Sequence, residues 1–406
     1  MRNLSLFEDQ RLTLEKAIAL TEESLNHYGA QYKHWAIAFS GGKDSTATLT
    51  IILHLLAQGR IPQPETLTVL YADTRQELPP LHQAAMASLK YARSLGCDVR
   101  IVLPEMDRRF WVYILGRGVP SPNNGTLRWC TRQIKVDPMI HALADVREQM
   151  RDGDRLLMLT GVRIGESAAR DQRIAVSCSK DGGECGQGWF QAMTAPQTDT
   201  LAPILHWRLC HVWDWLMLGA IEHGFPTADV AIAYGQKVGV GEEPIDGRTG
   251  CVGCPLVSDG TEDTLIRLVK QPQFAYLAPL QKIRPLHREI RKFKHRLQKT
   301  GLETKKDGTP VKNPGRKGPL TLQARIQFLE ELLAIQREVN TEAKTNGHAP
   351  VWLVTPREEA RIRELIDLRT FPDKWTGDEI AGDRLTDHWF SDGSVQPVLF
   401  DLEEVV

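Results

Sequence analysis

The most constraining feature of this sequence is an apolar segment, 34–39, that runs directly into the polar string SGGKDST at 40–46. The apolar segment predicts a buried strand, and the following residues 47–56 predict a helix. Gly41 and Gly42 allow positive φ and a close approach of the backbone to a ligand. Free N–H groups at the start of a helix favour an anion. The sequence therefore predicts a strand–loop–helix unit that binds an anion.

The same alternation continues through the first part of the chain. Further strands are predicted at 67–72, 99–103 and 156–160, with helices at 9–28 and 81–95. Strands that alternate with helices indicate an α/β fold with a mostly parallel sheet. In such sheets ligands bind at the carboxyl ends of the strands. Both the 40–46 loop and the residues from Gly161 onward follow such ends.

Past residue 260 the strand signal fades. Helices are predicted at 264–269, 285–297, 320–339 and 357–368, with Pro285 at the first position of its helix. The stretch 301–319 is rich in Gly, Pro and Lys and predicts a loop, and the tail from 372 reads as irregular. We therefore expect two domains: 1–260, which holds the N-terminal helix, the sheet and the cysteine cluster, and 261–406, a mainly helical extension.

Composition narrows the class of protein. With 406 residues, 42% hydrophobic and 25% charged, the chain suits a soluble globular protein of two domains. The first residues lack the apolar core of a signal peptide, and no apolar run is long enough to span a bilayer. We expect a cytoplasmic protein with no membrane partner. Seven cysteines in that compartment indicate metal ligands or buried thiols rather than disulfides.

The polar side chains of the 40–46 loop suit a phosphate ligand. Lys43 adds positive charge, and hydroxyls come from Ser40, Ser45 and Thr46. A carboxylate beside phosphates, here Asp44, indicates that Mg²⁺ binds there as well. The spacing G-x-x-x-x-G-K is absent, so this is not a Walker A loop.

The string 40–46 resembles the PP-loop of the adenine nucleotide α-hydrolase-like superfamily. That superfamily includes sulfonucleotide reductases, ATP sulfurylase-type enzymes, tRNA thiolases and GMP synthetase. The resemblance covers roughly residues 30–260 and implies a Rossmann-like sheet with flanking helices. It also implies that the loop holds the pyrophosphate of ATP with Mg²⁺, and that AMP is transferred to the substrate.

Three further strings resemble the sulfonucleotide reductase-like branch: YADT at 71–74, LRWCTRQIK at 127–135 and GVRIGESAAR at 161–170. The resemblance implies that Asp73 or its neighbouring backbone contacts the adenosine, although a helix N-cap role for Asp73 or Thr74 is an equal alternative. Arg163 and Arg170 are suited to clamp phosphates, and Glu166 to orient one of them. The expected catalytic residues are Lys43, Asp44, Arg163 and Arg170. The expected nucleotide-binding residues are Ser40, Gly41, Gly42, Lys43, Asp44, Ser45, Thr46, Asp73, Gly161, Arg163 and Glu166.

The cysteines indicate a metal centre. Cys251 and Cys254 form a C-x-x-C followed by Pro255, and Cys130 lies in the segment that holds a cluster cysteine in related proteins. The resemblance favours a [4Fe–4S] cluster, and zinc is the alternative. Iron–sulfur reductases of the family carry Cys-Cys where this chain has Trp129-Cys130. The fourth ligand is therefore open between Cys185, Cys178 and none. Cys97 and Cys210 are expected to be structural.

A basic segment follows in the second half. Residues 282–317 hold 13 Lys or Arg against three acidic residues, although the whole chain has a net charge of −1. A local excess of one sign is typical of a surface that binds a polyanion.

Together these features resemble the DNA phosphorothioation proteins of the Dnd and Ssp systems. The implied function is an ATP pyrophosphatase and sulfurtransferase that adenylylates a DNA backbone phosphate so that sulfur can replace oxygen. The implied partners are DNA, or tRNA, together with a cysteine desulfurase and other phosphorothioation subunits. The alternatives are a PAPS or APS reductase, a tRNA thiolase, and a nucleotide-sensing DNA-binding subunit without catalysis.

Overall fold

The chain forms two compact units, and neither is a continuous segment. The computed structural model describes residues 12–123, 125, 127–166, 171–172, 174–176, 188–192, 198–235, 250–257, 263–301, 307–309, 315–384 and 386–398. The first unit comprises Met1–Asp73, Glu77–Val102 and Asp137–Thr249, and the second comprises Thr74–Gln76, Leu103–Val136 and Gly250–Val406. Residues 103–136, which we assigned to the first domain on sequence, thus group with the C-terminal part.

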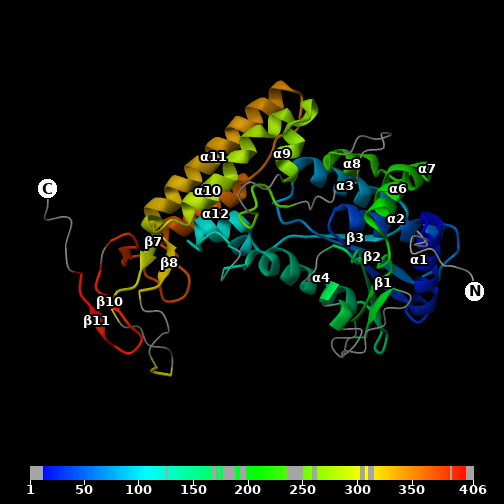
Figure 1. The fold of residues 1–406 in the computed structure, drawn as a ribbon, viewed down its shortest axis with the longest axis horizontal. Helices are drawn as coiled ribbons and strands as arrows, with labels where there is room; N and C mark the ends of the chain where they lie inside the picture. Colours follow the sequence, from blue (N-terminus) through cyan, green and yellow to red (C-terminus); the bar gives the residue numbers. More distant parts are fainter. Residues whose placement is uncertain are drawn as a thin grey trace, which may run out of the picture. The chain divides into compact units, whose positions relative to one another are not determined.

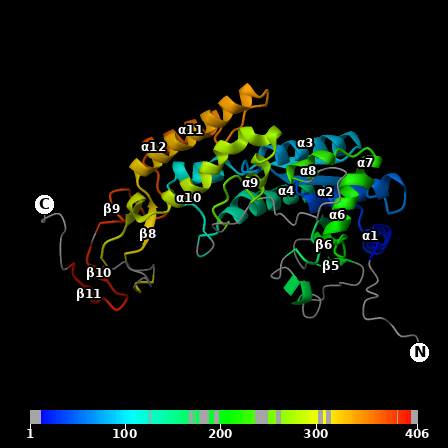
Figure 2. The same ribbon diagram turned by 45° about the horizontal axis from the view of Figure 1, so that its top comes forward.

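A six-stranded sheet forms the centre of the first unit, in the order β3-β2-β1-β4-β6-β5 (Figure 1). Its strands are β1 (His34–Phe39), β2 (Thr66–Ala72), β3 (Asp98–Val102), β4 (Leu156–Thr160), β5 (Trp189–Gln191) and β6 (Thr198–Ala202). All neighbouring pairs are parallel except β5 with β6, which continue the sheet at one edge (Figure 2). The predicted mostly parallel α/β fold is confirmed, and four of these strands lie within a residue of their predicted positions.

Helices flank this sheet on both sides. They are α1 (Leu14–Gly29), α2 (Lys43–Ala57), α3 (Pro79–Ser94), α4 (Asp137–Glu148), α6 (Leu209–Asp214), the π-helix η4 (Trp215–Gly219), α7 (Ala220–Glu222) and α8 (Ala228–Ala233). On one face, Ala142 and Val146 of α4 pack against Ala36, Leu70 and Met158. Because side chains alternate along a strand, the neighbouring core residues of β1 and β2 point to the opposite face.

Three tryptophans between 207 and 215 belong to the core of this unit. Trp207, Trp213 and Trp215 are at most 4% exposed. The Trp207 indole donates to the Thr21 hydroxyl of α1 at 2.9 Å, and that of Trp215 donates to Thr50 of α2 at 2.9 Å. These contacts fix α1 and α2 to the rest of the unit, and α2 carries the anion-binding loop at its start.

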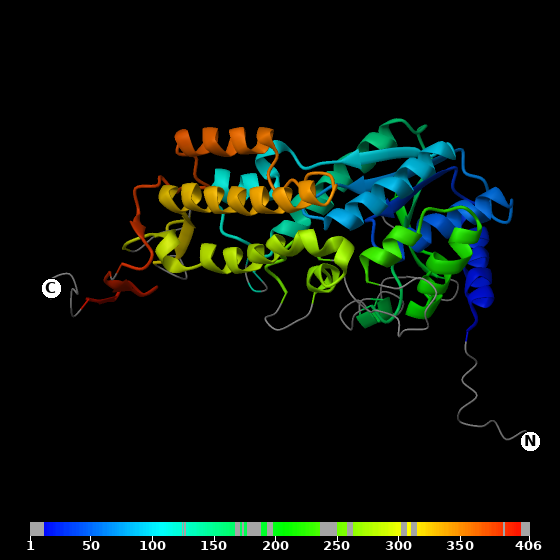
Figure 3. The ribbon, with the colours of Figure 1, turned by 90° about the horizontal axis from the view of Figure 1, so that it is seen from above.

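The second unit is mainly helical. It contains η1 (Met106–Arg108), η2 (Val112–Gly116), η3 (Arg132–Val136), α9 (Thr264–Val269), η5 (Pro272–Lys282), α10 (Ile283–Ile290), η6 (Phe293–His295), α11 (Leu322–Thr345) and α12 (Pro356–Asp367). The long helix α11 lies between α10 and α12 (Figure 3). Helix α12 begins with a capping box, in which Thr355 and Glu358 satisfy each other's backbone N–H groups.

Small strands occur in segments without a strand pattern in the sequence. They are β7 (Arg296–Gln298), β8 (Lys317–Leu320), β9 (Ile380–Ala381), β10 (His388–Trp389) and β11 (Val395–Gln396). The predicted helix 285–297 therefore ends early, at Ile290, and Pro285 is its third residue because η5 runs directly into α10. The pairing of β7 with β8 and β9 joins segments far apart in sequence, which local periodicity does not report. No helix among the residues placed here is long and apolar enough to cross a membrane.

A fully buried histidine lies in the core of the second unit. His287 is 0% exposed, and its ring stacks on Trp111 with the centroids 4.8 Å apart. Its Nδ1 lies 3.0 Å from the Ser121 hydroxyl. Burial, and to a lesser extent Arg291, lowers the pKa of His287 to about 3. The ring is therefore neutral in the folded protein between about pH 3 and pH 6.5, where an exposed histidine is mostly charged.

We expect acid to destabilise the second unit through this histidine. Between pH 6.5 and pH 3 the unfolded chain binds a proton at position 287 that the folded protein does not, so the free energy of unfolding falls as the pH falls. The expected slope is about 1.4 kcal/mol per pH unit at its maximum. Urea unfolding at pH 7.5, 6.0 and 5.0 measures it. In His287→Gln the free energy of unfolding should depend less on pH, by the uptake of one proton. An unchanged slope of this free energy against pH would contradict the role of His287.

Candidate phosphate-loop site

Residues 40–42 connect β1 to α2 and residues 43–46 form the first turn of α2, so this helix begins four residues earlier than predicted. Gly41 has φ +73°, and a Cβ placed on it would lie 2.7 Å from the Cβ of Ala85. A side chain is therefore excluded by both backbone conformation and space. Gly42 is the N-cap residue of α2 and offers no side-chain acceptor to the first N–H groups of the helix. These N–H groups give the loop its capacity to bind an anion.

The hydroxyls of the loop have different surroundings. The Ser45 hydroxyl donates to the Gly42 carbonyl at 3.0 Å and accepts from the Ser40 backbone N–H at 3.2 Å. The Ser40 hydroxyl lies 3.0 Å from that of Ser45. Thr46 is 0% exposed, and its hydroxyl has no hydrogen-bond partner among the residues that the structure describes. Ser45 thus shapes the loop, and both Ser40 and Ser45 line the cavity described below.

Three charged side chains form a network at the start of α2. Arg163 Nε donates to Asp44 Oδ1 at 2.5 Å, and Lys43 Nζ lies 3.3 Å from Asp44 Oδ2. Arg163 is 3% exposed and Lys43 is 4% exposed. Two buried cations therefore share one carboxylate, and Glu166 adds a second carboxylate to the cavity described below. Charge-assisted hydrogen bonds of this kind hold the side chains in one geometry.

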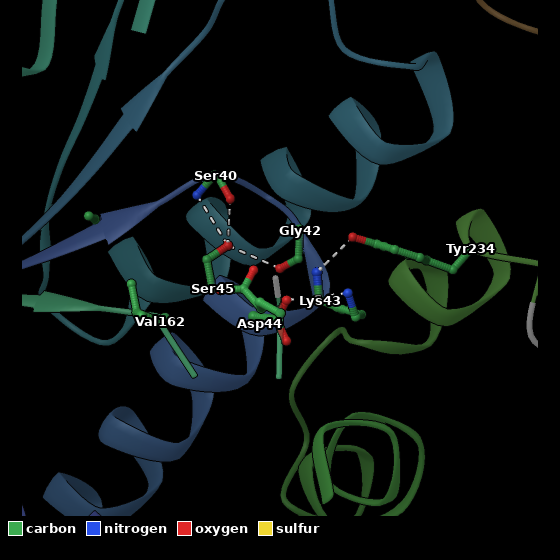
Figure 4. Close-up of a pocket in the computed structure, with 10 residues that line it drawn as sticks. Ser40, Gly42, Lys43, Asp44, Ser45, Val162 and Tyr234 are labelled. Atoms are coloured by element: carbon green, nitrogen blue, oxygen red, sulfur yellow. Dashed lines mark hydrogen bonds and ion pairs between the residues drawn. The ribbon is translucent and has the colours of Figure 1, made fainter. Parts of the chain in front are cut away.

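Tyr234, which the sequence analysis did not select, completes the site. Its hydroxyl accepts a hydrogen bond from the backbone N–H of Lys43 at 3.1 Å (Figure 4). Its ring lies 5.5 Å from Lys43 Nζ and packs edge-on against Trp213. The tyrosine lies 191 residues from Lys43 in sequence, directly after α8 (Ala228–Ala233), so no local motif marks it.

These residues surround a cavity of about 300 Å³. It is lined by Ala38, Ser40, Gly42, Lys43, Asp44, Ser45, Gly161, Val162, Glu166 and Tyr234. Gly161 follows β4 and packs on the loop, because a Cβ there would lie 3.0 Å from the Asp44 carbonyl oxygen. The structure thus brings Gly161, Arg163 and Glu166 to the loop, and Arg170 lies outside the described residues.

Asp73 directly follows β2 in the same unit but is not among the residues that line this cavity. It is 5% exposed and forms a group with Glu77 and His82, in which one ligand atom from each lies within 4.8 Å of the others. The His82 Nδ1 atom lies 3.3 Å from the Tyr71 hydroxyl. Two carboxylates and an imidazole are donors that bind a divalent cation. Sequence reasoning missed Glu77 and His82, although both follow Asp73 within nine positions.

Cys130 and Cys254 are brought together in the second unit. Burial raises the pKa of the Cys130 thiol, and the neighbouring Cys254 thiol adds to the rise. The Cys254 backbone N–H donates to the Cys251 carbonyl at 3.1 Å, so the C-x-x-C forms one tight turn. Within it Gly253 has φ +58°, and a Cβ there would lie 2.6 Å from Ile283. Cys185 and Cys178 lie outside the described residues. Cys97 is buried, whereas Cys210, expected to be structural, is exposed.

The basic segment is partly neutralised by the fold. Lys282 pairs with Glu338 at 2.6 Å, Lys299 with Glu379 at 2.6 Å, and Arg284 with Asp263. Glu289 accepts from both Lys292 and Lys294. Residues 302–306 and 310–314 of this segment lie outside the described residues. The charge of the segment is therefore less available to a ligand than its sequence indicates.

Comparison with known protein families finds a match within the first unit. Residues 34–223 match the family model of the phosphoadenosine phosphosulfate reductase domain. The match covers slightly less than half of the chain, from β1 to α7, and includes the loop, Gly161, Arg163 and Glu166. The cysteine turn at 251–254 and the basic segment lie beyond it.

Two uncharacterized proteins of Methanocaldococcus jannaschii are similar in sequence. One is 26% identical over 225 residues, which are 55% of this chain and 42% of that protein. The other is 25% identical over 193 residues, which are 47% of this chain and 33% of that protein. This chain therefore spans less than half the length of either relative.

Three solved structures share similarity at low identity. A phosphoadenylyl-sulfate reductase from Candida auris covers 58% of this chain and 98% of its own, with 13% identity and a TM-score of 0.34. The U34-tRNA thiolase NcsA from Methanococcus maripaludis, with its [4Fe-4S] cluster, covers 54% and 72%, with 16% identity and a TM-score of 0.32. The FMN adenylyltransferase of Candida glabrata covers 50% and 57%, with 14% identity and a TM-score of 0.31.

We expect Tyr234→Phe to bind inorganic pyrophosphate about 3- to 10-fold more tightly. The Tyr234 hydroxyl holds the Lys43 N–H that a phosphate oxygen would take, and a hydrogen bond contributes about 1 kcal/mol. Isothermal titration calorimetry measures the affinity. Tyr32→Phe, which removes a hydroxyl bound to Asp199 in the same unit, is the matched control. Weaker binding by Tyr234→Phe would show instead that the hydroxyl itself binds the phosphate.

Proposed function

We propose that this protein is an ATP pyrophosphatase and sulfurtransferase that activates a DNA backbone phosphate for replacement of oxygen by sulfur. The observation that carries the proposal is the loop 40–46, where the buried Lys43 and the start of α2 border a cavity of about 300 Å³ and the buried Arg163 pairs with Asp44 of the same loop. The match of residues 34–223 to the phosphoadenosine phosphosulfate reductase domain supports nucleotide-dependent sulfur chemistry at this loop.

In the proposed reaction the loop holds the pyrophosphate part of ATP. Lys43 and Arg163 neutralise the phosphates, and Asp44 would exchange its ion pairs for Mg²⁺. A non-bridging oxygen of a DNA phosphate attacks the α-phosphorus, the bond to pyrophosphate breaks, and an adenylylated DNA phosphate forms. The cations stabilise the charge that develops on the leaving pyrophosphate. Glu166 lines the cavity and is suited to orient Arg163 or the metal.

In the second step a sulfide-level sulfur attacks the adenylylated DNA phosphorus. The bond from this phosphorus to the AMP oxygen breaks, AMP leaves with that oxygen, and a phosphorothioate remains. We propose that a cysteine desulfurase supplies the sulfur as a persulfide and that a thiol reductant cleaves its S–S bond. This accounts for each atom without oxidation of the DNA.

The cysteines fit a metal centre made by thiolates. Cys130 and Cys254 lie close enough for one thiol to raise the pKa of the other, and Cys251 shares the turn of Cys254. We propose that these thiolates hold a [4Fe–4S] cluster, with Cys185 as the fourth ligand and zinc as the alternative metal. When bound, it would supply iron with affinity for sulfur.

The experiment measures pyrophosphate release from ATP by anaerobically purified protein, with and without DNA and sulfide. Release that depends on DNA, together with phosphorothioate in the digested DNA, supports the proposal. Release that depends on tRNA but not on DNA would assign a tRNA thiolase instead. Sulfite formed from PAPS would overturn the proposal in favour of a reductase, and binding of ATP without any release would favour a sensor.

We expect the double variant Lys292→Gln/Lys294→Gln to bind DNA about 5- to 20-fold more weakly. Both lysines are at least half exposed, and with His295 they hold the pKa of Glu289 at about 2. Their loss removes two phosphate contacts and leaves the Glu289 charge unshielded. A plot of the logarithm of the DNA affinity against the logarithm of the salt concentration should therefore have a slope that is smaller by about two. Fluorescence anisotropy at several salt concentrations measures both. The control Lys16→Gln/Lys90→Gln removes the same charge from exposed sites on the first unit.

A further inference from the structure

A group of three metal-binding side chains lies at the start of α3 in the first unit. Asp73 directly follows β2, Glu77 lies two residues before α3, and His82 is the fourth residue of that helix. One ligand atom from each of the three lies within 4.8 Å of the other two. Two ligands on opposite sides of one ion, with bonds of about 2.2 Å, are roughly 4.4 Å apart. The three atoms therefore need to move little to share one ion.

The fold of the first unit holds these side chains in place. Asp73 is 5% exposed, and its backbone N–H donates to the carbonyl of Val102, the last residue of β3, at 2.9 Å. The Nδ1 atom of His82 lies 3.3 Å from the hydroxyl of Tyr71, a fully buried residue. This contact fixes the orientation of the imidazole ring, as hydrogen bonds do for histidines that bind metals. The three side chains thus converge before any ion is bound, which lowers the cost of ordering them around one.

The kinds of donor in this group indicate the class of ion. Carboxylate oxygens suit Mg²⁺ and Mn²⁺ alike, whereas imidazole suits transition metals, so the mixed set favours Mn²⁺ over Mg²⁺. A carboxylate can bind an ion and still accept hydrogen bonds, because its two oxygens offer about four lone-pair positions. Other contacts of Asp73 and Glu77 are therefore compatible with a bound cation.

The group adjoins the phosphate loop but is separate from its cavity. A Cβ on Gly41 would lie 2.7 Å from the Cβ of Ala85 in α3 and 3.8 Å from the ring of Tyr71. The loop thus packs on the same helix that carries His82 and on the same tyrosine that orients it. The three metal-binding side chains are not among the residues that line the cavity of the loop.

We propose that Asp73, Glu77 and His82 bind a divalent transition-metal cation, with Mn²⁺ as the favoured ion, in the absence of nucleotide. The ion lies at the carboxyl end of β2, where ligands bind in parallel sheets. It is distinct from the Mg²⁺ proposed at Asp44, and it assigns Asp73 to an ion rather than to adenosine. This inference does not depend on the proposed function, because all three ligands belong to the protein and a chain that releases no pyrophosphate would still bind the ion.

Electron paramagnetic resonance of Mn²⁺ titrated into the full chain, without nucleotide, tests the proposal. Mn²⁺ is the probe because the thiolates of the cysteine turn select softer metals. We expect one tightly bound ion per chain, and at least tenfold weaker binding in Glu77→Gln and in His82→Gln, each of which removes one ligand. Asp44→Asn should retain the ion, which separates this site from the phosphate loop. The matched control His141→Gln/Glu148→Gln changes two exposed side chains of α4 and should bind like the wild type.

Two further measurements identify the ligands and control for folding. Modulation of the electron spin echo of bound Mn²⁺ by an imidazole nitrogen should be present in the wild type and absent from His82→Gln. Mn²⁺ at 100 times its Kd should raise Tm by about 5–10 °C in the wild type, and the same concentration should have little effect on the Tm of His82→Gln. Loss of the ion in Asp44→Asn, equal binding by His82→Gln and the α4 control, or no bound Mn²⁺ would overturn the proposal.

Discussion

Arg163→Met should lower kcat/KM for pyrophosphate release from ATP by about 100- to 1,000-fold. Arg163 is almost fully buried and donates to Asp44 Oδ1 at 2.5 Å. Its removal leaves the Asp44 carboxylate with Lys43 alone at the loop that holds the phosphates of ATP in the proposed reaction. The variant therefore loses one cation that stabilises the leaving pyrophosphate and also gains repulsion from an underneutralised carboxylate.

A double-mutant cycle separates these two effects. Asp44→Asn in the Arg163→Met background should recover part of the binding of pyrophosphate, because the unpaired charge is gone. It should not recover kcat if Asp44 also holds Mg²⁺. Arg93→Met, an exposed arginine on α3 in the same unit, is the matched control. If Arg163→Met and Arg93→Met had the same small effect, the loop would not be the site of pyrophosphate release.

Arg325→Met should lower the free energy of unfolding of the second unit by about 3–5 kcal/mol. Arg325 of α11 is 0% exposed and faces no carboxylate among the contacts described. Its guanidinium donates to the carbonyls of Leu115 at 2.8 Å, Thr370 at 2.9 Å and Leu365 at 3.2 Å, and also to Gly116. Burial lowers its pKa to about 10.

The reason for this large effect is the position of the acceptors. They lie at the end of η2 and at or just beyond the end of α12, where carbonyl groups have no partner within their own helix. A cation there also interacts favourably with the negative end of the helix dipole. Urea unfolding measures the loss. Arg337→Met, an exposed arginine on the same helix, should change stability by less than about 0.5 kcal/mol. A similar loss in both variants would refute the capping role.

The sequence by itself determined the frame of the first unit. The apolar run 34–39 followed by two glycines specifies a buried strand and a turn that no larger residue can make, and the structure places Gly41 at φ +73° for that reason. Alternation of strand and helix signals then specifies a parallel sheet, because crossover helices are required between parallel strands. The same alternation predicts that the string 161–170 begins at the end of a neighbouring strand. In the structure Gly161, Arg163 and Glu166 reach the loop.

The tertiary structure decided which side chains meet. Tyr234 reaches the Lys43 N–H from 191 positions away, and Cys130 meets Cys254 across more than a hundred residues. The basic segment carries 13 cations in sequence, yet Glu338, Asp263 and Glu379 come from outside it to neutralise three of them. Strand and helix signals arise from neighbours along the chain, whereas pairing of charges, thiols and lone donors depends on distances in space. Local periodicity carries no information about those distances.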